Sequence, residues 1–215
     1  MAQWRGCFCN NIPVLEGSEL ECERGGRKLF GPLSLRIAGG ELLRVAGPNG
    51  SGKTSLIRIL CGLLAPTNGQ VKWRGSPIGE LREDYSRHLV YLGHAPAVKD
   101  ELTPAENLDI ACRLVGVQAH KEALTWALSA FAVPDIPVRK LSQGQRRRAA
   151  LARLLMSESM RLWLLDEPFA ALDAGSVAYT EELIGRHLAA GGCVVYTTHQ
   201  PSALDAKARV VDLAH

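Results

Sequence analysis

Three groups of residues in this chain have the types and the spacing needed to handle a phosphate. The first is a glycine-rich segment, residues 47–54, which matches the pattern G-x-x-x-x-G-K-[ST]. Glycines let backbone N–H groups turn inward around phosphate oxygens, while the lysine adds a positive charge and the threonine hydroxyl suits Mg²⁺. The nucleotide-binding residues that this pattern predicts are Gly47, Pro48, Asn49, Gly50, Ser51, Gly52, Lys53, Thr54 and the adjoining Ser55.

An acidic pair, Asp166 and Glu167, follows an apolar run at 162–165. A carboxylate at the end of a buried strand can hold Mg²⁺ directly or through water. Transfer of a phosphoryl group to water also needs a base, and Glu167 is the only carboxylate so placed. If the strand continues, Glu167 points to the face opposite Asp166. An isolated Asp-Glu-Pro sequence is equally well explained as a charged turn, but a phosphate-binding loop in the same chain favours the catalytic interpretation.

The third group is a short polar segment that precedes a predicted helix. It consists of Leu141, Ser142, Gln143, Gly144 and Gln145. Ser142 and Gly144 open the helix, and the N-terminus of a helix is a place where anions bind. Ser142 is also a good N-cap, and the two roles are compatible. Inside the chain's own phosphate site this segment has no evident use.

In this order, the three groups resemble the ATP-binding cassette (ABC) ATPases, and the resemblance covers nearly all of residues 17–215. It implies that the polar segment faces the γ-phosphate held by a second subunit, so that a head-to-tail homodimer binds two ATP molecules between its protomers. It also implies that His199, after another apolar strand, contacts the γ-phosphate. Asp173 then belongs to the loop that passes between protomers, and it also fits as a cap for the helix that follows.

Two positions depart from the wider family. Most relatives have an aromatic residue that stacks on adenine where this chain has Arg24, although a guanidinium plane also stacks on a base. Most relatives have glutamine in the lid between the two lobes, where this chain has His94. Neutral imidazole can bridge a water on Mg²⁺, and its charge depends on pH. The resemblance therefore predicts adenine binding for Arg24 and a catalytic lid role for His94.

Alternating strand and helix signals predict an α/β fold, a P-loop NTPase core of the ABC ATPase kind with an inserted helical subdomain. Helical spacing over 56–64, stopped by Pro66, follows a strand and the glycine-rich loop, which is the context that a P-loop requires. Short apolar runs predict buried parallel strands at 42–46, 89–92, 162–165 and 194–196.

We predict an N-terminal extension at 1–16 and a single ATP-binding domain at 17–215, with the helical subdomain at about 95–159. A helix start is expected where Thr103 can cap, Pro104 takes the first helical position and Glu106 completes a capping box.

The composition excludes some classes of partner. A net charge of +3 is too small to indicate nucleic acid, so we expect the arginines at 146–148 to form a solvated or ion-paired helix face. No apolar run approaches the roughly 18 residues of a membrane span, and the N-terminus does not resemble a signal peptide, so we expect a soluble, cytoplasmic chain. The six cysteines are scattered and should be reduced, and for the close pair Cys7 and Cys9 we predict no function.

Several local sequences narrow the resemblance to one subfamily, the ATP-binding subunit of the haem exporter in bacterial cytochrome c maturation. They are Leu92-Gly93-His94, the short segment 99–107 and residues 197–200. The resemblance implies integral membrane permease subunits as partners, a place on the cytoplasmic face of the bacterial inner membrane, and an indirect link to a periplasmic haem chaperone. Another ABC transporter, a soluble ABC ATPase acting on ribosomes or DNA, and a binding module with a dead site stay open as alternatives.

Overall fold

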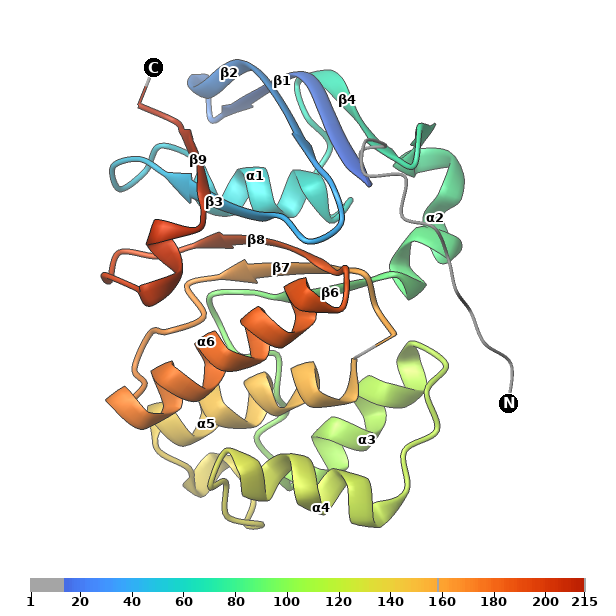
Figure 1. Ribbon diagram of the computed structural model, residues 1–215, viewed down its shortest axis with the longest axis vertical. Helices are drawn as coiled ribbons and strands as arrows, with labels where there is room; N and C mark the ends of the chain where they lie inside the picture. Colours follow the sequence, from blue (N-terminus) through green and yellow to red (C-terminus); the bar gives the residue numbers. More distant parts are fainter. Residues whose placement is uncertain (1–13, 158, 215) are drawn as a thin grey trace.

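The computed structural model describes residues 14–157 and 159–214. Two β-sheets enclose helix α1 (Lys53–Leu60), and further helices cover the outer face of the second sheet (Figure 1). This arrangement confirms the predicted α/β fold. Cys7 and Cys9 lie outside the described residues, and the four cysteines inside them are free thiols.

The first sheet is antiparallel, and no pattern in the sequence predicted it. Its strand order is β2-β1-β4-β5. The strands are β1 (Leu15–Arg24), β2 (Arg27–Ile37), β4 (Asn68–Trp73) and β5 (Ser76–Pro77). A two-glycine turn joins β1 to β2, and β1 begins two residues before the predicted start of the domain at 17.

The second sheet is parallel, in the order β6-β7-β8-β3-β9. Its strands are β3 (Leu42–Ala46), β6 (Leu89–Leu92), β7 (Leu162–Asp166), β8 (Cys193–Thr197) and β9 (Arg209–Asp212). Every residue of β7 and β8 is buried, which is why these strands are continuous apolar runs rather than alternating ones. The four predicted strands are confirmed.

Helix α1 ends earlier than predicted. It stops at Leu60, where the sequence suggested a helix continuing to Leu64. Gly62 takes a left-handed backbone (φ 76°), and the N–H groups of Leu63 and Leu64 both donate to the carbonyl of Arg58. This glycine-based C-terminal cap turns the chain out of the helix before Pro66 can act.

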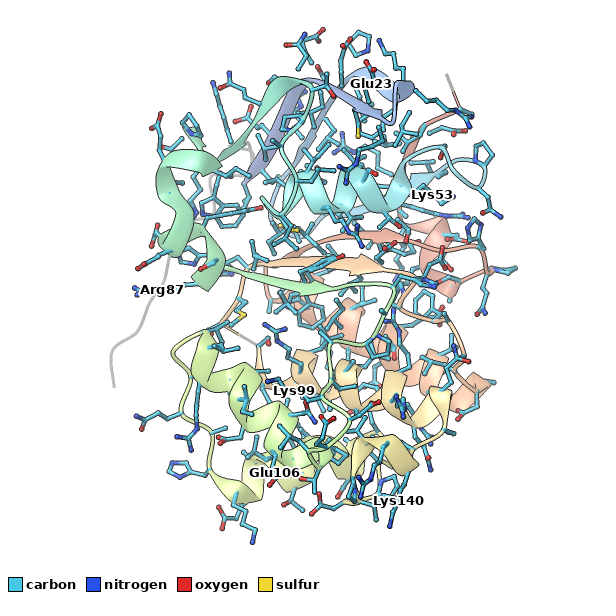
Figure 2. The ribbon with its side chains drawn as sticks, turned by 180° about the vertical axis from the view of Figure 1, so that it is seen from behind. Glu23, Lys53, Arg87, Lys99, Glu106 and Lys140 are labelled. Carbon is cyan, nitrogen blue, oxygen red and sulfur yellow. The ribbon has the colours of Figure 1, made fainter. Side chains whose placement is uncertain are left out.

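Residues 95–157 are mostly helical. They contain α3 (Pro104–Leu114), α4 (Lys121–Ala130), a 3₁₀ turn at Val138–Lys140, α5 (Gln143–Leu151) and a second 3₁₀ turn at Ala152–Met156. The predicted start of α3 is confirmed, with a capping box between Thr103 and Glu106 and proline in the first turn. Figure 2 shows Lys99, Glu106 and Lys140 in this region, away from Lys53. The division into an extension, a core and a subdomain stays a prediction.

Two remaining helices flank the sheets, α2 (Ile78–Arg87) before β6 and α6 (Ala174–Ala189) before β8. A short 3₁₀ turn, Ala203–Ala206, precedes β9. Among the described residues, no helix combines the length and the apolar character that a membrane crossing requires.

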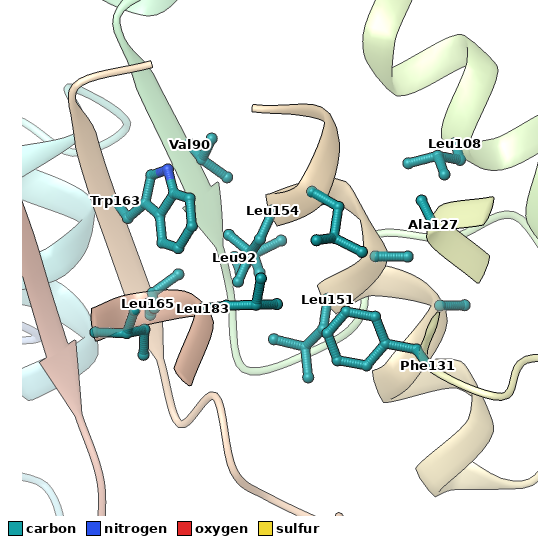
Figure 3. Packing of buried hydrophobic residues seen from close by; sticks show 14 of the residues in the cluster. Val90, Leu92, Leu108, Ala127, Phe131, Leu151, Leu154, Trp163, Leu165 and Leu183 are labelled. Carbon is teal, nitrogen blue, oxygen red and sulfur yellow. The ribbon is translucent and has the colours of Figure 1, made fainter. Parts of the chain in front are cut away.

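Two apolar cores lie on opposite faces of the parallel sheet. One surrounds α1 between the two sheets, with Leu56 and Ile57 fully buried. The other extends from Leu92 and Trp163 in the sheet through Leu151 to the helices beyond (Figure 3). Because this second core is continuous, α5 is fixed against the carboxyl ends of the strands that carry the candidate site.

Candidate functional site

A cavity of about 740 Å³ opens where the parallel strands end and α1 begins. In an open parallel sheet, this is the edge at which ligands bind. The cavity is lined by Leu29, Asn49, Gly50, Gly52, Lys53, Thr54, Ser55, His94, Asp166, Glu167, Ala170 and His199. The fold thus brings ten of the predicted site residues together from four separate segments of the chain.

The glycine-rich loop connects β3 to α1. Gly52 precedes the helix and no side chain caps it, so the first turn of α1 presents its N–H groups and its positive dipole end to the cavity. Lys53 is buried, and its Nζ donates to the carbonyls of Gly47 at 2.8 Å and Pro48 at 3.0 Å. The ammonium is therefore held at the loop, where the phosphates of a nucleotide would meet it.

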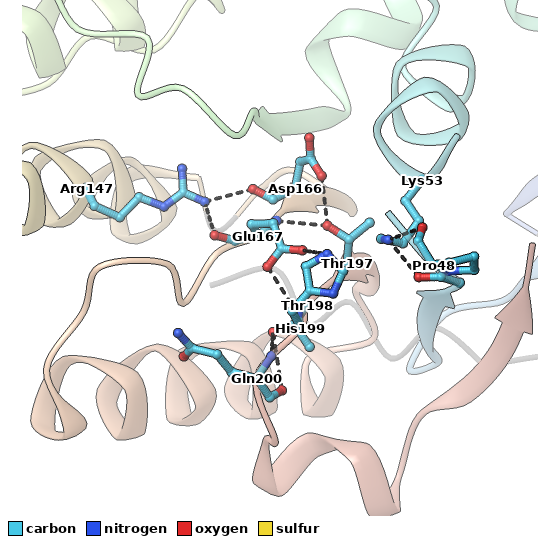
Figure 4. A network of polar contacts seen from close by, with 10 residues as sticks. Pro48, Lys53, Arg147, Asp166, Glu167, Thr197, Thr198, His199 and Gln200 are labelled. Atoms are coloured by element: carbon cyan, nitrogen blue, oxygen red, sulfur yellow. Dashed lines mark hydrogen bonds and ion pairs between the residues drawn. The ribbon is translucent and has the colours of Figure 1, made fainter. Parts of the chain in front are cut away.

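Asp166 and Thr197 lie opposite each other on neighbouring strands β7 and β8. The Thr197 hydroxyl donates to Asp166 Oδ1 at 2.8 Å and accepts from the Glu167 N–H at 2.9 Å (Figure 4). Asp166 Oδ2 is buried with no hydrogen-bond partner in the described part of the chain. A buried carboxylate oxygen without a partner, in a cavity that Thr54 also lines, is a donor set suited to a hard cation such as Mg²⁺.

Glu167 does not continue the strand. Strand β7 ends at Asp166, and Glu167 has a left-handed backbone (φ 54°), so the expected alternation of faces does not apply. The turn keeps both carboxylates at one cavity. Glu167 Oε2 accepts from the His199 N–H at 3.3 Å, and its Oε1 lies 3.5 Å from His199 Nε2. A left-handed glutamate costs about 1–3 kcal/mol, so other contacts must hold it there.

His94 follows β6 by two residues and lines the same cavity as an exposed side chain. It shares this lining with Glu167 and Lys53, and it lies in the chain between the end of β6 and the helical region. The geometry therefore agrees with a position at the boundary of the two parts.

The polar segment 141–145 does not line this cavity. Its Ser142 caps α5, because Ser142 Oγ accepts from the Gln145 N–H at 3.2 Å and Gln145 Oε1 accepts from the Ser142 N–H at 2.8 Å. A side chain at Gly144 would place its Cβ 2.7 Å from the Ala171 carbonyl oxygen, so glycine permits the close approach of these two segments. The segment therefore contributes no residue to the lining of the chain's own cavity.

The loop at 170–173 contacts α5 at Gly144 and at Arg148. Asp173 caps α6 by accepting from the Ser176 N–H at 2.8 Å, which confirms the predicted capping role. Its second carboxylate oxygen lies 3.3 Å from Arg148.

Arg24 is not among the residues that line the cavity. It is exposed at the end of β1, and from this hairpin it is Leu29 that reaches the lining. Leu29 belongs to no sequence motif, so no pattern could have identified it as a site residue.

Two residues near the carboxylates of Asp166 and Glu167 were not predicted as part of the site. Thr197 could have been found from its place opposite Asp166, once the strands were paired. Arg147 was predicted to lie on a solvated or ion-paired face, and this is wrong, because it is 2% exposed and donates to backbone carbonyls. Burial lowers the pKa of its guanidinium, and the charges of Asp166 and Glu167 oppose that effect. Its neighbours Arg146 and Arg148 do form ion pairs, with Asp100 and Asp173.

The parallel sheet, the glycine-rich loop and the paired carboxylates define a P-loop nucleoside triphosphatase. Residues 30–170 match the ABC transporter family. The chain belongs to this family and is an ABC-type ATPase that binds ATP.

Named relatives extend the match to most of the chain. The cytochrome c biogenesis ATP-binding export protein CcmA of Aromatoleum aromaticum is 50% identical over 95% of this chain and 97% of its own length. The protein of the same name from Pseudomonas fluorescens is 48% identical, over 94% of this chain and 97% of its own.

Solved structures agree on the fold. The ATP-binding subunit of an ABC transporter superimposes with a TM-score of 0.82 at 23% identity, covering 94% of this chain and 86% of its own. A dimeric ATP-binding cassette in a post-hydrolysis state with ADP and Pi gives 0.75 at 22% identity, covering 86% and 88%.

Proposed function

We propose that this chain hydrolyses ATP as the energy-supplying subunit of an export complex that serves cytochrome c biogenesis. The observation that carries the hydrolytic part is the convergence of Lys53, Asp166, Glu167 and His199 on one cavity. The names and the high identity of the relatives support the part that concerns cytochrome c.

ATP binding would use the loop at 47–55. The N–H groups at the start of α1 and the Lys53 ammonium would hold the β- and γ-phosphates. The Thr54 hydroxyl and Asp166 would hold Mg²⁺, and His94 would reach it through water. When bound, Mg²⁺ would neutralise charge on the phosphates and so favour attack at the γ-phosphorus.

Glu167 would act as the general base. Its carboxylate would accept a proton from water as the water oxygen bonds to the γ-phosphorus and the bond to the β–γ bridging oxygen breaks, leaving ADP and phosphate. The two contacts from His199 to Glu167 hold this carboxylate in place. His199 would also meet the γ-phosphate.

Completion of the site would need a second copy of the chain. The segment formed by Leu141, Ser142, Gln143, Gly144 and Gln145 caps a helix but does not line its own cavity. In a head-to-tail homodimer this helix terminus would face the γ-phosphate of the partner, and the Asp173 loop would pass between protomers. Two ATP molecules would then lie at the interface. Arg24 would approach the adenine from the hairpin.

The partners would be integral membrane permease subunits, with this chain peripheral on the cytoplasmic face of the bacterial inner membrane. The periplasmic haem chaperone would be linked only indirectly, and no nucleic acid is expected to bind. Purification of the tagged chain from detergent-solubilised membranes tests this: co-purifying polytopic membrane proteins support the proposal, and ribosomal or DNA-bound partners contradict it.

The variant Glu167→Gln tests the catalytic assignment. It keeps the side-chain shape and removes the base, so ATP hydrolysis should fall roughly 10²–10⁴-fold while ATP binding persists. Glu83→Gln, the same substitution at an exposed residue of α2, is the matched control and should behave as wild type. Hydrolysis by Glu167→Gln at the wild-type rate would show that Glu167 is not the base.

The cytochrome c assignment is tested separately, in a bacterial strain from which the gene for its own cytochrome c biogenesis ATP-binding protein has been deleted. The wild-type chain should restore c-type cytochromes with covalently attached haem, which haem staining of a denaturing gel detects. The variant Glu167→Gln should not restore them. Failure of the wild-type chain to restore c-type cytochromes would assign it to a different transporter.

A further inference from the structure

Arg147 lies on α5, five residues after the helix cap Ser142, and is 2% exposed. Its guanidinium extends from the helix to the carboxyl ends of the parallel strands, beside Asp166 and Glu167 (Figure 4). It makes no side-chain ion pair among the described residues; backbone carbonyls are its hydrogen-bond partners.

All the hydrogen-bonding capacity of this side chain is used. A guanidinium has five N–H donors in a fixed planar fork. Nη1 donates at 2.7 Å and 3.4 Å, and Nε donates at 3.4 Å. Nη2 donates at 2.8 Å to one carbonyl and makes a shorter contact to the next. The five acceptors are the carbonyls of Gly93, His94, Asp166, Glu167 and Pro168.

These carbonyls belong to two loops that leave neighbouring strands. Gly93 and His94 follow β6, and the other three stand at the end of β7 and after it. One of them is the carbonyl of Glu167, whose left-handed backbone turns its carboxylate into the cavity. Through these hydrogen bonds, a single side chain of α5 contacts the backbone of both Glu167 and His94.

We propose that Arg147 is a positioning residue for ATP hydrolysis: it holds the Glu167 turn and the His94 loop in register with α5. Movement of α5 would thereby change the position of the base. This inference depends on the proposal that Glu167 is the base. It is specific to arginine, because a lysine ammonium offers three donors from one point and cannot span both loops.

Arg153 provides a matched comparison. It lies six residues further along the same helical segment and is half-buried. Its Nε has no hydrogen-bond partner in the described part of the chain, and it does not line the ATP cavity. Arg153→Met thus removes a partly buried guanidinium from the same segment without touching either loop.

The test compares Arg147→Met, Arg147→Lys and Arg153→Met in the purified full-length chain and in the assembled membrane complex. For Arg147→Met we expect kcat to fall roughly 10- to 100-fold, because small misplacements of a catalytic group have effects of that size. The dissociation constant for ATP should change less than about threefold, and Arg147→Lys should recover part of the lost kcat. Arg153→Met should keep the wild-type kcat, whatever its Tm.

A double variant separates positioning from folding. If Arg147 acts through Glu167, adding Arg147→Met to Glu167→Gln should lower the residual rate by less than twofold. An undiminished 10- to 100-fold loss in that background would overturn the proposal, as would wild-type kcat in Arg147→Met. If Arg147→Met does not fold, Arg147→Lys decides: kcat and KM at wild-type values would refute the positioning role. A wild-type rate in Glu167→Gln alone would instead refute the assigned base.

Discussion

Acidification should destabilise the fold through His187, a buried histidine in the last turn of α6. Its ring stacks on Trp163, with centroids 3.9 Å apart and planes 7° from parallel. The side chain is 7% exposed, and its Nε2 has no hydrogen-bond partner in the described part of the chain. Arg161 adds a positive charge nearby, and Arg186 lines the same small cavity. A protonated imidazole is unfavourable in this environment.

Burial is the main cause of a low His187 pKa of about 4, against 6.5 for an exposed histidine. The unfolded chain therefore binds a proton more readily than the folded one between these values. The stabilisation is fully present above pH 6.5 and is lost as the pH falls through about 4. The whole difference corresponds to about 3 kcal/mol, of which about 2 kcal/mol is lost by pH 5.

Urea unfolding between pH 7 and pH 5 measures this effect. The variant His187→Gln removes the titrating group, so its free energy of unfolding should fall by about 2 kcal/mol less than that of the wild type over this range. His120→Gln, at an exposed position before α4, is the control and should follow the wild type. The reasoning is refuted if the wild type and His187→Gln lose stability in parallel from pH 7 to pH 5.

Three further outcomes follow from the site. Lys53→Ala should raise the dissociation constant for ATP about 10- to 100-fold, since it removes a charged hydrogen-bond donor; equilibrium nucleotide titration with unchanged affinity would contradict this. Ser142→Arg should abolish hydrolysis, but each monomer should still bind one ATP. Full ATPase activity of wild-type monomers at high dilution would rule out a shared site. His94→Gln should keep most ATPase activity, whereas His94→Ala should lose more of it and also lose c-type cytochrome maturation. Wild-type behaviour of His94→Ala in both assays would refute the lid role.

Local patterns in the sequence were sufficient where the physical cause is local. The strand at Leu89–Leu92 is apolar because both faces of a parallel sheet are covered, and it has the predicted bounds. The capping boxes at Thr103 and Ser142 each depend on a residue three positions along the chain. The glycine-rich loop between β3 and α1 is likewise a contiguous motif, so its phosphate-binding role could be predicted from consecutive residues.

The turn at Glu167 depended on the tertiary structure. Alternation along a strand predicted opposite faces for Asp166 and Glu167, but the strand ends between them. Contacts from β8 and α5, far away in sequence, hold the left-handed glutamate, and no local pattern reports them.

The sequence by itself determined the class of chemistry, because phosphate binding and its paired carboxylates are encoded in short motifs of fixed spacing. It also determined four of the five strands of the parallel sheet and where two of the helices begin. Only the tertiary structure decided that Arg147 is buried among carbonyls while Arg146 and Arg148 form surface ion pairs. The three arginines are identical in type and consecutive in sequence. Their roles differ because the helix turns about 100° per residue and only one of these directions faces the ends of the strands.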